Sequence, residues 1–258
     1  MSVRRSMRAW GAMAALLAAP AIAIAQANTP VVAVLYFDNN SFGKDRADYD
    51  GLGKGIADLL INDMATNPSM RIVERDRIQS ILQEQSLVST KSIDPQTAVK
   101  LGKLLGAQYM VTGGFMSDGK GTLVLTSRVI NVETSAITNP VKLQSKADDV
   151  LGLIAQLSTK LNTELKLPGL PRQTGDAGVA KPADVGATRQ AGQRVARSTP
   201  AKSQKLDVKT ALLYSKALDE QDSGNAQKAA ELYQAVLQKF PDFGPAKQKL
   251  AKVQKSGH

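Results

Sequence analysis

Few residues of this chain have the type and spacing for chemistry. Glu74 and Asp76 could form a carboxylate pair for acid–base catalysis, but they stand where an apolar run meets a helical pattern. Gln79 follows Asp76 at three residues, which is the spacing of a helix-capping box. No electrophile, metal ligand or second acidic cluster accompanies the pair. We therefore predict that Asp76 caps a helix and that the pair is not catalytic.

Cysteine and histidine chemistry is almost entirely excluded. The 258 residues include no cysteine, and the one histidine is the last residue, His258. Disulfides, thiolate metal sites, cysteine nucleophiles and histidine-based triads cannot be built from this composition. Gly51, Gly53 and Gly55 precede a helical pattern, but the Gly-Lys-Ser/Thr ending of a phosphate-binding loop is missing. We expect these glycines to let the chain pass close to a sheet. We predict no catalytic residue, no cofactor, no metal and no enzymatic activity.

Residues 1–25 have the pattern of a secretory signal peptide. Three arginines precede an apolar run over residues 9–19, and small residues offer cleavage after Ala25 or Ala27. A membrane-spanning helix is the alternative interpretation, but Pro20 interrupts the run. Removal of the signal lowers the net charge from +10 to +7. We predict an exported, basic, periplasmic protein that is not a lipoprotein, since no cysteine can be acylated. The sequence leaves open the general secretory and twin-arginine routes.

Residues 30–166 are expected to form one α/β domain, a mixed sheet with packed helices. The apolar run at 31–37 suits a strand that is covered on both faces. The patterns predict strand 31–37, helix 52–64, strand 70–73, helix 76–82, helix 95–105, strands 108–116, 122–132 and 136–144, and helix 150–165.

The composition changes after this domain. Residues 167–206 are rich in Pro, Ala and Gly and contain seven basic and two acidic residues, which predicts a disordered linker. Its charge could hold the chain near an anionic envelope surface, and a solvated spacer is the simpler alternative. Residues 207–256 return to helical periodicity and are expected to form a small all-α helical hairpin module.

Several motifs of the first domain resemble the CsgG family of curli assembly and transport components, which has the TolB N-terminal-like fold. The similarity runs from about Val31 to Leu165. The motifs are Val-Ala-Val-Leu-Tyr-Phe at 32–37, Gly-Leu-Gly-Lys-Gly-Ile-Ala-Asp at 51–58, Val-Glu-Arg at 73–75, the segment 101–114 and Arg-Val-Ile-Asn-Val-Glu-Thr at 128–134.

Two departures from CsgG affect what the resemblance implies. CsgG is a lipoprotein, and each subunit adds two membrane-spanning hairpins of about twenty residues each. Here the first predicted hairpin loop is only residues 117–121, and the third strand leads directly into the helix at Val150. We therefore predict a shared fold without transmembrane hairpins.

The C-terminal module resembles a single tetratricopeptide repeat. Gly224, Ala229, Tyr233 and Pro241 stand at the spacing of that repeat. One repeat cannot bury a full core, so the module is expected to borrow surface from another chain or domain. An isolated helical hairpin is the alternative. If the first helix is used as in that family, Tyr214 and Gln221 would face the groove and bind a partner.

The resemblance implies a non-enzymatic periplasmic component for assembly or transport at the outer membrane, acting as a protein-binding scaffold. The α/β domain would self-associate or dock on an envelope complex, and the repeat-like module would recruit another envelope protein. A curli-type secretion channel subunit and a regulator of a cell-wall synthase are the alternatives. Export and the absence of basic–aromatic interleaving argue against nucleic acid. Peripheral outer-membrane association through the linker is also open.

Overall fold

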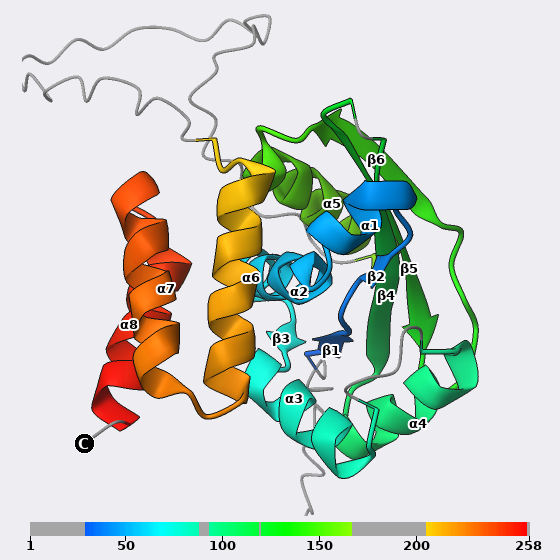
Figure 1. Ribbon diagram of the computed structural model, residues 1–258. Coiled ribbons are helices and arrows are strands. Elements are labelled where there is room, and N and C mark those ends of the chain that lie inside the picture. Colours follow the sequence, from blue (N-terminus) through cyan, green and yellow to red (C-terminus); the bar gives the residue numbers. More distant parts are fainter. Residues whose placement is uncertain (1–28, 88–92, 119, 167–204, 257–258) are drawn as a thin grey trace, which may run out of the picture.

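The computed structural model describes residues 29–87, 93–118, 120–166 and 205–256. They form a mixed α/β domain with a module of three helices against one side of it (Figure 1). The predicted signal peptide, and the predicted linker up to residue 204, lie outside the described residues. None of the described helices combines the length and the hydrophobicity that a membrane-spanning helix requires.

The order of elements matches the predicted order, with two short additions, β2 and α1. The α/β domain consists of β1 (Val31–Val34), β2 (Asp38–Asn39), α1 (Gly43–Asp48), α2 (Leu52–Met64), β3 (Arg71–Ile72), α3 (Arg75–Glu84), α4 (Pro95–Leu105), β4 (Tyr109–Ser117), β5 (Thr122–Asn131), β6 (Val141–Lys146) and α5 (Val150–Glu164). The module consists of α6 (Val208–Asp222), α7 (Ala226–Lys239) and α8 (Gly244–Ser256).

The sheet has the order β3-β1-β4-β5-β6, and β2 pairs with β4 beyond the end of β1. β1 is parallel to both of its neighbours, while β4, β5 and β6 are antiparallel. Val32, Ala33 and Val34 are fully buried, which confirms that β1 is covered on both faces. α5 packs on β6 and α2, and α4 packs on β4 and β5. The mixed sheet with packed helices is therefore the observed architecture.

The ends of α4 follow the sequence signals. The carboxylate of Asp94 accepts hydrogen bonds from the backbone N–H groups of Gln96 and Thr97, and Pro95 occupies the first helical position. Gly106 ends the helix with a φ of 66°, in the left-handed region that glycine adopts without strain.

The start of α3 differs from the prediction. The N-cap residue is Glu74, without a side-chain hydrogen bond to the helix, and Asp76 lies within the first turn. Gln79 is buried and accepts a hydrogen bond of 2.6 Å from the hydroxyl of Tyr36. The predicted capping box is therefore wrong. Its residues are engaged elsewhere: Gln79 bonds Tyr36, and Asp76 pairs with basic side chains.

The module is joined to the α/β domain at the start of α6. The backbone N–H of Val150 donates to the carbonyl of Leu206 at 2.9 Å, and that of Val208 donates to Ala147 at 2.7 Å. Leu206, predicted as the last residue of a disordered linker, is 1% exposed. α6 then packs against α2, beside which it lies in Figure 1. The module thus borrows its surface from the α/β domain of its own chain.

Candidate functional site

The contact between α2 and α6 depends on glycines of the 51–55 motif. A Cβ atom on Gly55 would lie 1.9 Å from the hydroxyl oxygen of Ser215 and 3.2 Å from its Cβ atom, so any larger residue there would have to displace Ser215. A Cβ atom on Gly53 would lie 1.8 Å from the carbonyl oxygen of Phe37, beside the sheet. The predicted close passage to the sheet is confirmed for Gly53, whereas Gly55 serves the contact with the module.

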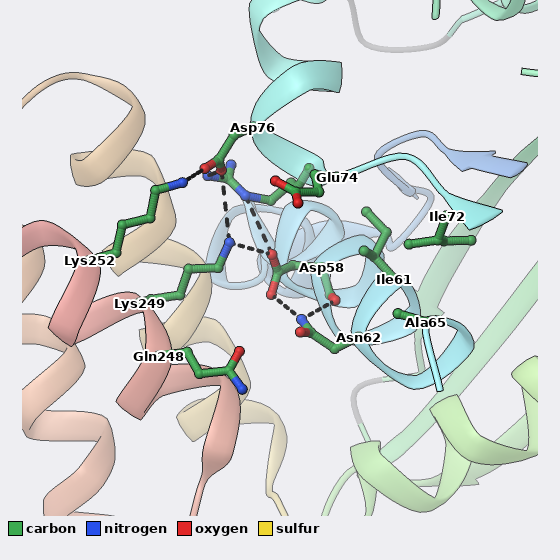
Figure 2. A pocket seen from close by; sticks show the side chains of 11 residues that line it. Asp58, Ile61, Asn62, Ala65, Ile72, Glu74, Asp76, Gln248, Lys249 and Lys252 are labelled. Atoms are coloured by element: carbon green, nitrogen blue, oxygen red, sulfur yellow. Dashed lines mark hydrogen bonds and ion pairs between the residues drawn. The ribbon is translucent and has the colours of Figure 1, made fainter. Parts of the chain in front are cut away.

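Beside this contact lies a group of charged residues that we name the interdomain charge cluster. Its members come from α2 and α3 of the α/β domain and from α6 and α8 of the module. They are Lys54, Asp58, Arg75, Asp76, Asp219, Asp222, Lys249 and Lys252. Figure 2 shows the side of the cluster where Lys249 and Lys252 reach from α8 toward Asp58 and Asp76.

Arg75 is the centre of the cluster, and its side chain is 1% exposed. Its two terminal nitrogens donate to the two carboxylate oxygens of Asp222 at 2.8 Å each, which is the strong bidentate geometry. One of them also donates to Asp76 at 2.9 Å, and Nε lies 3.4 Å from Asp58. Burial acts to lower the pKa of Arg75, but the bonds to Asp222 outweigh burial and raise it.

Asp58 is buried in α2 and links the two parts of the chain. Its carboxylate accepts hydrogen bonds from the hydroxyl of Tyr214 at 2.6 Å and from Asn62 at 2.9 Å. Nζ of Lys249 lies 3.1 Å from the same carboxylate. Burial, and then the charge of Asp58, raise the pKa of Tyr214 well above its usual value, so the hydroxyl stays protonated and can donate.

The two residues predicted to bind a partner lie in different surroundings. Tyr214 is fully buried, and its ring packs against Tyr233 and Phe243, so it is not available to a partner in this conformation. The predicted groove position of Tyr214 is filled by α2 of the same chain. Gln221 is partly exposed and accepts a hydrogen bond of 2.8 Å from Tyr233. Partner binding by Gln221 stays a prediction.

Lys54 connects α2 to the end of α6. Its amino group lies 2.5 Å from Asp219 and 2.8 Å from Asp222, and 5.4 Å from the ring centre of Tyr36. Burial raises the pKa of Tyr36, so this phenol remains neutral beside the cluster. The ion pairs of the cluster that cross between the parts therefore join a residue of α2 or α3 to one of α6 or α8, while Lys205 and Asp148 form a separate pair at 3.7 Å near the start of α6.

A pocket of about 280 Å³ opens where α2, α3 and α8 meet. Its floor is apolar, from Ile61, Ala65 and Ile72, and its walls are charged (Figure 2). Glu74 lines the pocket, whereas its neighbour Asp76 pairs with Arg75, Lys249 and Lys252. Within the described part of the chain, no group of three or more His, Asp and Glu residues is placed to hold a metal ion. Charged side chains in this arrangement can bind a charged partner, but most of them are already paired with one another within the chain.

We expect the docking of the module to weaken in acid. Burial acts to raise the pKa of Asp76, but the hydrogen bond from Lys252 and the charges of Lys249 and Arg75 hold it below its usual value. A lowered carboxyl pKa contributes stability that is present above the unfolded value and is lost as the pH falls through the folded value. Hydrogen exchange of α8, which carries Lys249 and Lys252, should therefore accelerate below about pH 4, relative to β5. In Asp76→Asn that dependence should be shallower, and an unchanged dependence would contradict this role.

The interdomain charge cluster was not predicted from the sequence, although the spacing of like charges on two helices is a signal of it. Asp219 and Asp222 are three residues apart on α6, and Lys249 and Lys252 are three apart on α8. Residues at this spacing share a helix face, so each helix presents a pair of like charges toward one side. Such pairs repel one another unless opposite charges face them.

Known proteins support the family resemblance for the first part of the chain. The family model described as the curli production assembly/transport component CsgG matches residues 17–121. No curated protein sequence matches the chain.

Similar solved structures are distant in sequence. The LpoB C-terminal domain from Salmonella enterica is 17% identical, with 46% of this chain and 83% of that domain covered and a TM-score of 0.36. TolB from Acinetobacter baumannii is 11% identical, with 53% and 28% covered and a TM-score of 0.35. The PelC dodecamer from Paraburkholderia phytofirmans is 13% identical, with 54% and 89% covered and a TM-score of 0.34. The resemblance to the CsgG family that the motifs predicted is confirmed by the family model, over residues 17–121.

Proposed function

We propose that this chain is a non-enzymatic, protein-binding scaffold of the CsgG type that acts in assembly or transport at the outer membrane. Export by the signal peptide predicted at residues 1–25 would place it in the periplasm. The observation that supports this proposal most is the fixed position of the module on the CsgG-like domain. Because α6 is held by buried charges, α7 and α8 are presented outward at a defined place.

The module offers apolar surface to a partner. Leu232, Leu237 and Leu250 are only partly buried although they pack against the core. Helical repeats normally stack on neighbours at such surfaces. A second envelope protein, or another copy of this chain, would complete the stack. A scaffold of this kind works by binding and catalyses no chemical reaction.

Site-specific photocrosslinking in cells tests the proposal. A photoreactive residue at Leu250 of α8 should give an adduct with another envelope protein, while one at Lys103 on α4 serves as the control for non-specific capture. Absence of adducts from Leu250 and Leu237, or turnover by the purified chain, would contradict it. The identity of the adduct separates the alternatives: a wall synthase favours a regulator, and a second copy or secreted cargo favours a channel assembly.

A further inference from the structure

The outer edge of the sheet, at β6, has backbone groups and charges that suit one more strand. We propose that this edge binds an extended acidic segment of another protein, which joins the sheet as a further strand. β6 is the last strand in the order β3-β1-β4-β5-β6, and no strand among the described residues lies beyond it. Addition of a strand to an exposed sheet edge is a common mode of peptide recognition. The proposed function concerns the outward surfaces of α7 and α8, so this inference adds a second binding surface, on the α/β domain.

The register of β5 and β6 shows which backbone groups of β6 point outward. The N–H of Ala147 donates to the carbonyl of Gly121 at 2.8 Å, at the end of the β5–β6 pairing. Positions that bond across an antiparallel pair alternate with positions that do not. The residues of β6 whose N–H and C=O groups point away from β5 are therefore Lys142, Gln144 and Lys146. Of these outward groups, only the carbonyl of Lys146 accepts a backbone hydrogen bond within the described chain.

The side chains of the same three residues make one face of β6 basic. Lys142, Gln144 and Lys146 are exposed, whereas Leu143 on the opposite face is buried, where α5 packs on β6. Arg128 is also exposed, and it lies on the basic face because Thr126, two residues before it, pairs with Lys142. β5 and β6 contain no acidic residue. Within the described chain, none of the three cations takes part in an ion pair.

The charges of β6 favour an acidic strand over a second copy of this chain. In an added strand, the residue opposite Lys142 or Lys146 lies beside it on the same face of the sheet, where opposite charges attract and like charges repel. A second β6 would bring lysines together, and edge lysines normally prevent sheets from pairing edge to edge in this way. A strand with carboxylates at both positions would instead meet two unpaired cations. The backbone bonds would supply affinity, and these side chains would supply selectivity.

The alternation of β6 also predicts the sequence pattern of the partner segment. Lys142 and Lys146 are four residues apart, so the two acidic residues of the partner must have the same separation. The residue opposite Gln144 would share the solvent-exposed face and can be polar. The residue opposite Leu143 would lie on the face toward α5, which favours an apolar side chain. The partner segment is therefore expected to have the order acidic, apolar, polar, any residue, acidic.

Fluorescence anisotropy with designed peptides at low salt tests the inference. A labelled peptide with the core Glu-Val-Thr-Val-Glu reads the same in both directions, so it can pair with β6 in either orientation. It should bind the wild-type chain at least tenfold more tightly than the double variant Lys142→Glu, Lys146→Glu. A peptide with the core Lys-Val-Thr-Val-Lys should show the reverse preference. The matched control is Lys100→Glu, Lys103→Glu, which makes the same change of charge at exposed positions of α4 and should leave both affinities unchanged.

A modified peptide separates strand addition from simple charge attraction. Methylation of the backbone nitrogen of the central threonine removes the N–H that would bond to β6 opposite Gln144 but keeps every charge, so it should weaken binding at least tenfold. Equal binding of the methylated peptide, no binding of the acidic peptide to the wild-type chain, or dimerisation of the chain through β6 would overturn the inference. If the double variant does not fold by circular dichroism, Lys142→Gln replaces it and should bind the acidic peptide more weakly. The crosslinks expected at Leu250 concern α8, so they can fail or succeed independently of the peptide result.

Discussion

Replacing Arg75 with methionine should lower the free energy of unfolding by about 3–5 kcal/mol. The side chain is 1% exposed and is shared by Asp58, Asp76 and Asp222, of which Asp58 is equally buried. Methionine fills a similar volume but leaves those carboxylates without their central cation. Removing one partner of a buried pair costs more than the pair contributes, because the remaining charge stays out of water.

Chemical denaturation of the purified chain measures this loss. Arg71→Met is the matched control, since Arg71 is exposed on β3 only four residues away. Its substitution should change the free energy of unfolding by less than about 0.5 kcal/mol. A similar effect of both substitutions would show that the contacts of Arg75 with Asp222 and Asp58 do not stabilise the docked module.

Replacing Tyr214 with alanine should be comparably damaging, at about 3–5 kcal/mol, the range for truncating large buried rings. The ring is fully buried, with centroids 5.8 Å from Tyr233 and 5.2 Å from Phe243. Alanine would leave a cavity at the junction of α6, α7 and α2. It would also remove the hydroxyl that donates to Asp58 at 2.6 Å.

Replacing Tyr214 with phenylalanine separates the contribution of its ring to stability from that of its hydroxyl. Tyr214→Phe keeps the packing and should cost about 1.5–3 kcal/mol, as for a hydrogen bond to a charged group. Tyr233→Phe removes a hydroxyl that donates to the neutral side chain of Gln221 and should cost only about 0.5–1.5 kcal/mol. Thermal unfolding of the three variants checks this order, and a larger loss in Tyr233→Phe would refute the importance of Asp58.

The α/β fold could be predicted because its signals are local. Continuous apolar residues mark β1, helical periodicity marks α2 and α5, and Asp94 and Gly106 mark the ends of α4. The short additions β2 and α1 were missed, since α1 has no buried residue and so shows no helical apolar stripe. The resemblance to a single tetratricopeptide repeat stays a prediction.

The docking of the module could not be predicted from periodicity. Arg75 and Asp222 are 147 residues apart, and nothing near either one marks it as buried. Charged residues are normally expected at the surface, so the helical patterns around Asp58 and Arg75 do not indicate that these side chains are buried. The capping role predicted for Asp76 is wrong for the same reason, because a cap is the local explanation for a carboxylate at that place and its partners on α8 are distant in the sequence.

The distribution of charges in the interdomain charge cluster affects how the module associates with the CsgG-like domain. The CsgG-like domain contributes Lys54 and Arg75 with Asp58 and Asp76, and the module contributes Lys249 and Lys252 with Asp219 and Asp222. Each set is electrically neutral, so neither attracts the other from afar as oppositely charged patches do. The module and the domain therefore select each other only in close contact, where each charged side chain must meet one of opposite charge. Simple polycations or polyanions should therefore be poor substitutes for either part.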